Sequence, residues 1–244
     1  MTDADMTVWS WLTTAASWQG EDGILHRLWE HVWLSAASVF IACLIALPVG
    51  IGLGHLGRGG ALAINLANVG RAVPTLGVII LFAVSPLGLN TATLIATLVL
   101  FGIPPILANA YVGVDTVDRD AKESARGMGM GGWQVLRRVE VPLALPLIAA
   151  GVRTSALQVV ATATLAGYTG YGTLGAIIFR GFTVNYTYLV VGGAILVAAL
   201  ALVTELLLAL VQRAVTPAGL RVGAGTPVRD ASTLGQPQRA SAAA

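Results

Sequence analysis

The residues with the greatest capacity for chemistry lie in one polar stretch, Asp115 to Pro146. This stretch holds five of the fourteen basic residues and five of the twelve acidic residues. It also contains the only lysine of the sequence, Lys122. No Gly-x-x-x-x-Gly-Lys-Ser/Thr loop accompanies that lysine, so the chain lacks the phosphate-binding loop of an ATPase. The sequence also shows no nucleophile–base pair and no cluster of metal ligands. We therefore expect a chain that is not an enzyme and that binds no cofactor or metal itself.

The polar stretch has the pattern of a helix, a glycine turn and a second helix. Asp115 or Asp118 can cap the first helix, and Ala125 belongs to its small-residue face. Gly129 is one of four closely spaced glycines that interrupt helical structure. Trp133 opens the second helix, which we expect to end at Pro142, because a proline disfavours helical conformation in the residue before it. Such an element between apolar segments is either a solvated loop or a docking site for a soluble partner.

The elements around this stretch must be membrane helices. Hydrophobic residues make up 56% of the 244-residue chain and charged residues only 11%, whereas about 25% charged residues is usual in a soluble domain. Uncharged runs are long enough to cross the apolar core of a bilayer, about 30 Å, as helices. The expected fold class is all-α, a polytopic membrane protein. Its five expected spans cover about residues 32–53, 63–84, 91–111, 143–168 and 188–212.

The two flanks of this domain have different compositions. Five of the six tryptophans lie within the first 33 residues, and tryptophan favours the membrane–water interface. No basic residue precedes Arg27, so we expect residues 1–31 to be an external interfacial segment and not a cleavable signal. Residues 213–244 are rich in Gly, Ala, Pro and Ser and lack aromatic residues, which predicts a disordered tail. The single cysteine, Cys43, excludes an internal disulfide.

The distribution of charge predicts the orientation in the membrane. With five spans, the central loop 115–142 and the tail share one side. That side carries eleven of the fourteen basic residues, counting Arg71. Because positive charge accumulates in cytoplasmic loops, we expect the loop and the C-terminus inside the cell and the N-terminus outside. The expected location is the bacterial plasma membrane.

The central stretch resembles the membrane-spanning subunits of ATP-binding-cassette importers. Their signature is Glu-Ala-Ala, three residues, Gly, nine residues, Ile, one residue and Leu-Pro. The positions in register here are Glu123, Ser124, Ala125, Gly129, Val139, Val141 and Pro142. Serine replaces one alanine, and the two valines replace the isoleucine and the leucine. The resemblance implies a type I importer fold similar to that of methionine permeases.

The same resemblance implies a mechanism and a set of partners. A loop helix around residues 123–129 would sit in a groove of a separate cytoplasmic ATPase, which binds ATP and Mg²⁺. Glu123 would fix the loop through hydrogen bonds or an ion pair, and Gly129 would give its turn backbone freedom. Two permease chains, identical or paralogous, would pair with two ATPase chains. An external solute-binding protein would deliver the cargo.

Three further runs are similar to the osmoprotectant branch of these importers, at residues 70–77, 161–166 and 170–175. That branch imports glycine betaine, carnitine, choline or proline betaine. Permeases of the methionine or phosphonate type are the close alternatives. An ion-coupled secondary transporter is a further one, although it needs ionisable groups near the bilayer midplane. The intramembrane candidates Arg71, Arg153 and Glu205 all lie toward the cytoplasmic ends of their spans.

Four residues are candidates for lining the translocation pathway: Arg71, Pro74, Tyr168 and Tyr171. Arg71 interrupts the second expected span, and Pro74 should bend that span just beyond it. The two tyrosines could contribute to an aromatic cage for a quaternary ammonium group. Packing at an interface is the favoured interpretation of these rings, because the resemblance places specificity in the binding protein.

Overall fold

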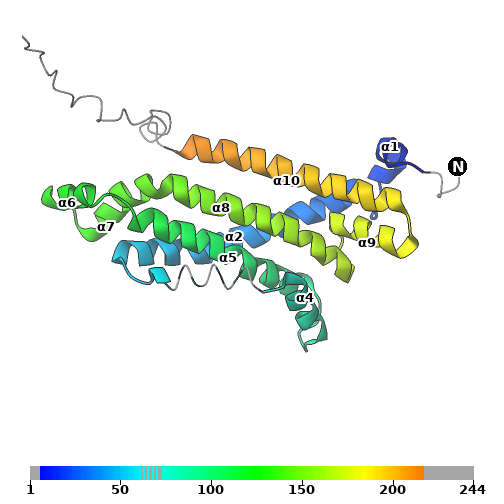
Figure 1. Ribbon diagram of the computed structural model, residues 1–244, viewed down its shortest axis with the longest axis horizontal. Helices are drawn as coiled ribbons and strands as arrows, with labels where there is room; N and C mark the ends of the chain where they lie inside the picture. Colours follow the sequence, from blue (N-terminus) through cyan, green and yellow to red (C-terminus); the bar gives the residue numbers. More distant parts are fainter. Residues whose placement is uncertain are drawn as a thin grey trace, which may run out of the picture.

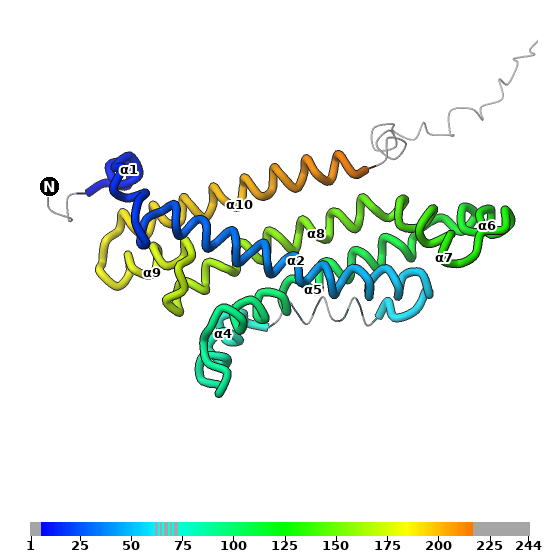
Figure 2. Tube along the Cα trace, turned by 180° about the vertical axis from the view of Figure 1, so that it is seen from behind, coloured from blue at the N-terminus to red at the C-terminus, as the bar shows by residue number. Residues whose placement is uncertain are grey.

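The computed structural model describes residues 6–61, 63, 65, 68, 70 and 73–216, and every element in this part is helical. In chain order the elements are α1 (Val8–Thr13), the 3₁₀ turn η2 (Ala15–Trp18), α2 (Ile24–Leu56), α4 (Thr75–Val84), α5 (Thr91–Asp115), α6 (Arg119–Gly127), α7 (Gly132–Val135), the π-helical turn η3 (Leu136–Glu140), α8 (Val141–Ala163), the 3₁₀ turn η4 (Thr164–Thr169), α9 (Leu174–Val184) and α10 (Thr187–Val215). The long helices run side by side (Figure 1). Helices α6 and α7 lie at one end of the bundle, and α1 and α9 lie at the other (Figure 2).

Four helical segments of the described chain are long and apolar enough to cross a membrane. They cover residues 24–56, 91–115, 132–169 and 187–215. These segments coincide with the first, third, fourth and fifth spans expected from the sequence, although α2 begins well before the expected residue 32. The remaining expected span, 63–84, is represented in its second half by α4. Several residues of its first half lie outside the described residues.

Helices α2 and α5 pack closely because one face of α2 carries only small side chains. That face is made of four buried residues spaced by one helical turn, Ala42, Ala46, Gly50 and Gly54. A Cβ atom on Gly50 would lie 2.8 Å from the carbonyl oxygen of Leu107, and one on Gly54 would lie 2.8 Å from that of Tyr111. Small residues allow this close approach of two backbones, which is a common way for membrane helices to associate.

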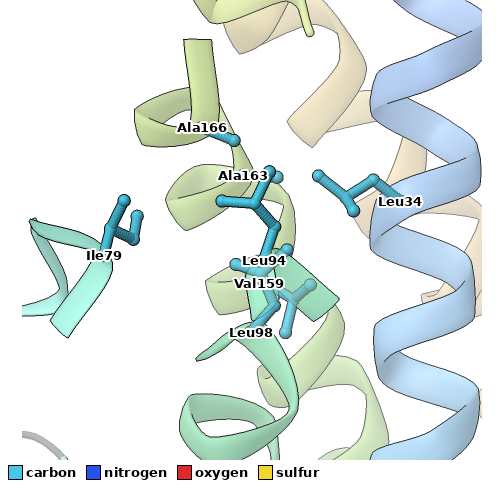
Figure 3. Packing of buried hydrophobic residues seen from close by; sticks show 7 residues of the cluster. All are labelled: Leu34, Ile79, Leu94, Leu98, Val159, Ala163 and Ala166. Carbon is cyan, nitrogen blue, oxygen red and sulfur yellow. The ribbon is translucent and has the colours of Figure 1, made fainter. Parts of the chain in front are cut away.

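A cluster of buried apolar side chains joins α4 to the bundle (Figure 3). Its members come from α2, α4, α5, α8 and η4: Leu34, Ile79, Leu94, Leu98, Val159, Ala163 and Ala166. Ile79 is the only buried residue of α4, so this short helix is attached to the rest of the molecule through one face. Pro74 precedes α4 as its N-cap. The chain therefore starts a new helix at the position where the sequence predicted a bend.

The first part of the chain packs against the start of α10. Trp11 of α1 is buried and lies against Gly192, where a Cβ atom would come within 2.6 Å of the tryptophan ring. The neighbouring tryptophans Trp9 and Trp29 are exposed. An aromatic belt at the membrane surface requires such exposure. The placement of residues 1–31 at that surface remains a prediction.

One expectation about the central stretch is wrong. Pro142 does not end the second loop helix, because α7, η3 and α8 form one continuous helical segment from Gly132 to Thr169. Pro142 is the second residue of α8, which begins directly after the π-helical turn η3. A proline is tolerated where its missing N–H removes no regular hydrogen bond, and the wider π-helical turn provides such a place. The loop is thus built directly onto a membrane-spanning helix.

Candidate functional site

The first loop helix, α6, begins after the second of its two candidate caps, Asp118, and ends at the glycines, as the sequence predicted. The Asp118 side chain caps it by accepting a hydrogen bond of 2.7 Å from the backbone N–H of Asp120. After Gly127 the chain turns through Gly129, whose φ of 82° is in the left-handed region. Backbone bonds from Gly129 to Arg126 and from Met130 to Ala125 close this turn. A residue with a side chain is strained in that conformation, so the position suits glycine.

The residues of the importer signature lie on different sides of the loop. Ala125 is buried, while Glu123 and Ser124 are exposed, and Val139 and Pro142 are half-buried. The Glu123 carboxylate forms no ion pair with the described residues. Its suggested role in fixing the loop therefore remains a prediction, and within the described chain other residues hold the loop in place.

Two large apolar side chains add to the exposed surface of the loop. Met128 is 72% exposed and Trp133 is 69% exposed. Met128 follows α6 and Trp133 belongs to α7, so the two side chains flank the glycine turn. Helices α6 and α7 lie at one end of the bundle (Figure 1). Large apolar side chains that remain accessible next to charged ones are typical of a surface that another protein covers.

Lys122 connects α6 to the end of α5. Its Nζ donates a hydrogen bond of 3.1 Å to the carbonyl oxygen of Val114, and it lies 3.5 Å from that of Asp115. These are carbonyl groups at the C-terminal end of a helix, where a cation is favoured. The same Nζ lies 3.7 Å from Oε1 of Glu140.

Glu140 is the residue that sequence reasoning missed. Its side chain is 1% exposed, and its Oε2 lies 2.5 Å from Nδ1 of His55 at the end of α2. Glu140, Lys122 and His55 thus form a cluster, here named the loop-end cluster, which brings together three separate elements. A signal was available: Glu140 is an acidic residue between two valines, directly before the apolar run of α8.

A polar cavity of about 360 Å³ separates α6 from the end of α2. Its lining includes His55, Asp115, Arg119, Lys122, Glu123 and Arg126. Because this space lies beside α6, the helix is attached to the bundle mainly by its buried Ala125 and by the loop-end cluster.

The residues suggested for the translocation pathway are not brought together by the described structure. Arg71 lies outside the described residues, and Pro74 is exposed at the start of α4. Tyr168 contacts Phe179 edge to face, with ring centroids 5.3 Å apart, so no cation fits between these rings. Tyr171 packs instead against the apolar cluster of Figure 3. These contacts agree with packing roles for the aromatic rings, and a lining role remains a prediction.

Two of the three candidate intramembrane charges, Arg153 and Glu205, form a second cluster, here named the α8–α10 clamp. Arg153 of α8 donates from Nε to Oε2 of Glu205 over 2.9 Å and from Nη2 to the other carboxylate oxygen. Its Nη1 donates to Gln212 over 3.0 Å, and the Gln212 amide donates to the carbonyl oxygen of Pro146 over 3.2 Å. Each charge has a partner on the neighbouring helix, which is the arrangement of a structural clamp.

Comparison with known families decides the identity of the chain. Residues 32–217 match the family model described as binding-protein-dependent transport system inner membrane component. The chain belongs to this family. It is therefore a membrane-embedded, multi-pass transport subunit and not an enzyme.

Individual relatives agree with the assignment. The chain is 36% identical over 198 residues to the glycine betaine/carnitine/choline transport system permease protein OpuCB of Bacillus subtilis, covering 81% of this chain and 91% of the relative. It is 39% identical to the carnitine transport permease protein OpuCB of Listeria monocytogenes, with 81% and 90% covered. The osmoprotectant import permease protein OsmW of Salmonella typhimurium is 29% identical over 79% of this chain and 91% of its own length.

Solved structures confirm the fold. The MetNI methionine ABC transporter in an inward-facing conformation matches with a TM-score of 0.68 at 22% identity, over 80% of this chain and 96% of that one. An amino acid ABC transporter crystallised with histidines matches with a TM-score of 0.61 at 20% identity, over 78% and 92% of the two chains. The expected all-α type I importer permease fold is thus confirmed.

Proposed function

We propose that this permease imports a small osmoprotectant of the glycine betaine, carnitine, choline or proline betaine type. The proposal rests on the substrates in the names of the similar permeases, which are glycine betaine, carnitine and choline. Permeases of Bacillus subtilis and Listeria monocytogenes for glycine betaine, carnitine or choline are 35–39% identical to this chain over most of its length. The methionine transporter is a match at 22% identity, which bears on the fold alone.

We further propose that α6 is the element through which a separate ATPase drives transport. Two ATPase chains would hold ATP and Mg²⁺, and two permease chains, identical or paralogous, would form the membrane part. The exposed Glu123, Met128 and Trp133 support this role, because they combine a free carboxylate with accessible apolar surface. The external solute-binding protein would deliver cargo at the opposite end of the bundle, where α1 and α9 lie (Figure 2).

The proposed orientation places α6 and the C-terminus in the cytoplasm and the N-terminus outside. The described basic residues near the two ends of the bundle support it. The end with α6 carries Arg58, Arg119, Lys122, Arg126, Arg137, Arg138 and Arg213. The end with α1 and α9 carries Arg27 and Arg180. A strong excess of positive charge marks the cytoplasmic side of a bacterial membrane protein.

Reconstitution tests the proposal. Proteoliposomes would contain this permease with its ATPase, and the solute-binding protein would be added on the side of α9. Labelled glycine betaine, carnitine and choline would be compared with labelled methionine and a phosphonate. We expect accumulation of at least one osmoprotectant that requires both ATP and the binding protein and that persists when ionophores remove ion gradients.

Two results would contradict specific parts of the proposal. Accumulation of methionine or a phosphonate without any osmoprotectant would exclude the proposed substrate class. Accumulation by the permease alone, abolished by ionophores, would exclude ATP-driven transport and favour a secondary transporter.

A further inference from the structure

Among the ion-paired side chains of the described chain, that of Glu140 is the most buried. It lies in the π-helical turn η3 at the start of the long α8 helix, with 1% of its side chain exposed. Its two carboxylate oxygens have different partners. One lies 2.5 Å from His55 at the end of α2, and the other lies 3.7 Å from Lys122 of α6.

These contacts join the loop helix to several long helices at one point. Lys122 also binds the last carbonyl groups of α5, and η3 continues directly into α8. The Glu140 carboxylate therefore lies where α2, α6 and the start of α8 meet, with α5 attached through Lys122. No other ion pair of the described chain joins α6 to a long helix.

The rest of α6 has few attachments. A cavity of about 360 Å³ lies between this helix and the end of α2. The charged residues Arg119, Glu123 and Arg126 line that cavity, and Ala125 is the only buried residue of the helix. Besides its direct chain connection to α5 and the Lys122 hydrogen bonds there, α6 reaches the long helices through Ala125, the glycine turn and the Glu140 contacts.

We propose that Glu140 is a positioning residue that transmits movement of α6 to α2 and α8 through His55 and Lys122. This inference depends on the proposed function, since an ATPase must move α6. A buried carboxylate is strongly unfavourable without partners. Moving α6 or the end of α2 away from Glu140 would remove one of the two partners of this buried charge. Movement of the three elements together keeps both partners in place. The π-helical turn adds to the argument, because such turns occur often at functional sites in helices.

The test measures the number of solute molecules accumulated per ATP hydrolysed, in proteoliposomes that contain permease, ATPase and binding protein. In Glu140→Gln the side chain keeps its shape and loses its charge. We expect ATP hydrolysis to continue while the ratio of solute to ATP falls roughly threefold or more, within the range of couplings measured along such networks. Arg58→Gln is the control that also removes one charge, since Arg58 is exposed in the turn after α2 and has no ion pair within the described chain. It should keep the wild-type ratio.

A second variant keeps the inference testable if Glu140→Gln does not assemble. His55→Leu removes the hydrogen-bonding group that α2 offers to Glu140 and leaves Glu140 beside Lys122. We expect the same direction of change, and the double variant should fall no further than the more affected single variant, because both act through one contact. An unchanged ratio in an assembled variant would overturn the inference. Failure of both variants to assemble would also overturn it, because the cluster would then serve folding.

The two proposals fail in different ways. If the wild-type complex accumulates no solute with ATP, the proposed function is wrong. If the wild-type complex transports solute and the Glu140→Gln complex has the same ratio of solute to ATP as the wild type, only the proposed role of Glu140 is wrong.

Discussion

Glu140 and Glu205 are both paired with basic side chains from other helices, but their surroundings differ. Glu140 is fully buried and has one partner on each of two other elements. Glu205 keeps 30% of its side chain exposed and accepts hydrogen bonds from Nε and Nη2 of one arginine, Arg153, whose Nη1 binds Gln212. The first carboxylate joins a loop helix to the bundle, whereas the second joins two adjacent long helices.

This difference indicates which charged clusters transmit movement and which stabilise the assembled protein. A clamp between two neighbouring helices stabilises their packing and stays closed when the helices move together. The loop-end cluster joins a loosely attached helix, α6, to the bundle. Under the proposed function, movement of α6 by the ATPase reaches the long helices through this cluster. Variants at the loop end should therefore change transport in a protein that still assembles. Variants in the α8–α10 clamp should change stability and leave the transport of each assembled complex unchanged.

The largest effect is expected from Gly129→Asp at the loop end. The φ of 82° at this position strains a residue with a side chain by about 1 kcal/mol or more, and the added carboxylate would project from the surface that we assign to the ATPase. We expect uptake to be abolished while the permease still reaches the membrane. Uptake of labelled solute and the amount of permease in isolated membranes would be measured together.

Gly88→Asp is the control for this prediction. Gly88 also has a positive φ, 64°, and open space around an added Cβ, but it lies in the turn between α4 and α5, away from the loop. This variant carries the same backbone strain and the same added charge and should keep most of its uptake. Wild-type ATP-dependent uptake in Gly129→Asp would show that the glycine turn does not dock against the ATPase.

A smaller effect is expected from Glu205→Gln in the clamp. The change leaves Arg153 with two amide partners and no carboxylate, which we expect to cost roughly 1 kcal/mol, as for polar contacts between membrane helices. Thermal denaturation of the purified permease in nanodiscs should shift downward, and uptake per assembled complex should stay near the wild-type value. The double variant Arg153→Gln with Glu205→Gln should regain part of the lost stability, because it leaves no unpaired charge.

This prediction also separates the two transport mechanisms. Loss of uptake in Glu205→Gln, with normal amounts of permease and normal ATP hydrolysis, would indicate that an ion is coupled through the carboxylate. It would also remove the distinction between the clamp and the loop-end cluster.

The sequence predicted the features that depend on local pattern. Span length follows from bilayer thickness, and the signature from Glu123 to Pro142 requires only fixed spacing along the chain. The pair of Glu140 and His55 joins residues 85 positions apart. No periodicity links these two positions, since their contact exists only once α2 and α8 have packed. Sequence reasoning therefore found the loop and missed the residue that attaches it to the bundle.

The prolines show a second limit of sequence reasoning. Pro142 lies inside a continuous helical segment, and Pro74 precedes the start of one. The sequence suggested a helix end at the first and a bend at the second. Whether a proline ends a helix depends on the hydrogen bonds available to the turn before it. At Pro142 that turn is π-helical, and neither the residue types nor their spacing indicated this.

The smallest effect is expected when the chain is cut after Thr216. Helix α10 ends at Val215 and the family match ends at residue 217, so the cut leaves both the clamp and the loop end intact. It removes Arg221, Arg229 and Arg239, but eight of the eleven basic residues assigned to the cytoplasmic side remain, against two on the other side. We therefore expect unchanged orientation, assembly with the ATPase and uptake.

A cut after Leu210 is the matched comparison for this truncation. It removes Gln212, the clamp residue that connects Arg153 to the Pro146 carbonyl. Thermal denaturation should show a loss of stability for this shorter chain only. Equal stability of the two truncated chains would mean that Gln212 contributes nothing to the clamp and that Glu205 alone neutralises Arg153. A defect in the longer chain would instead assign a function to the residues beyond Thr216, separate from both charge clusters.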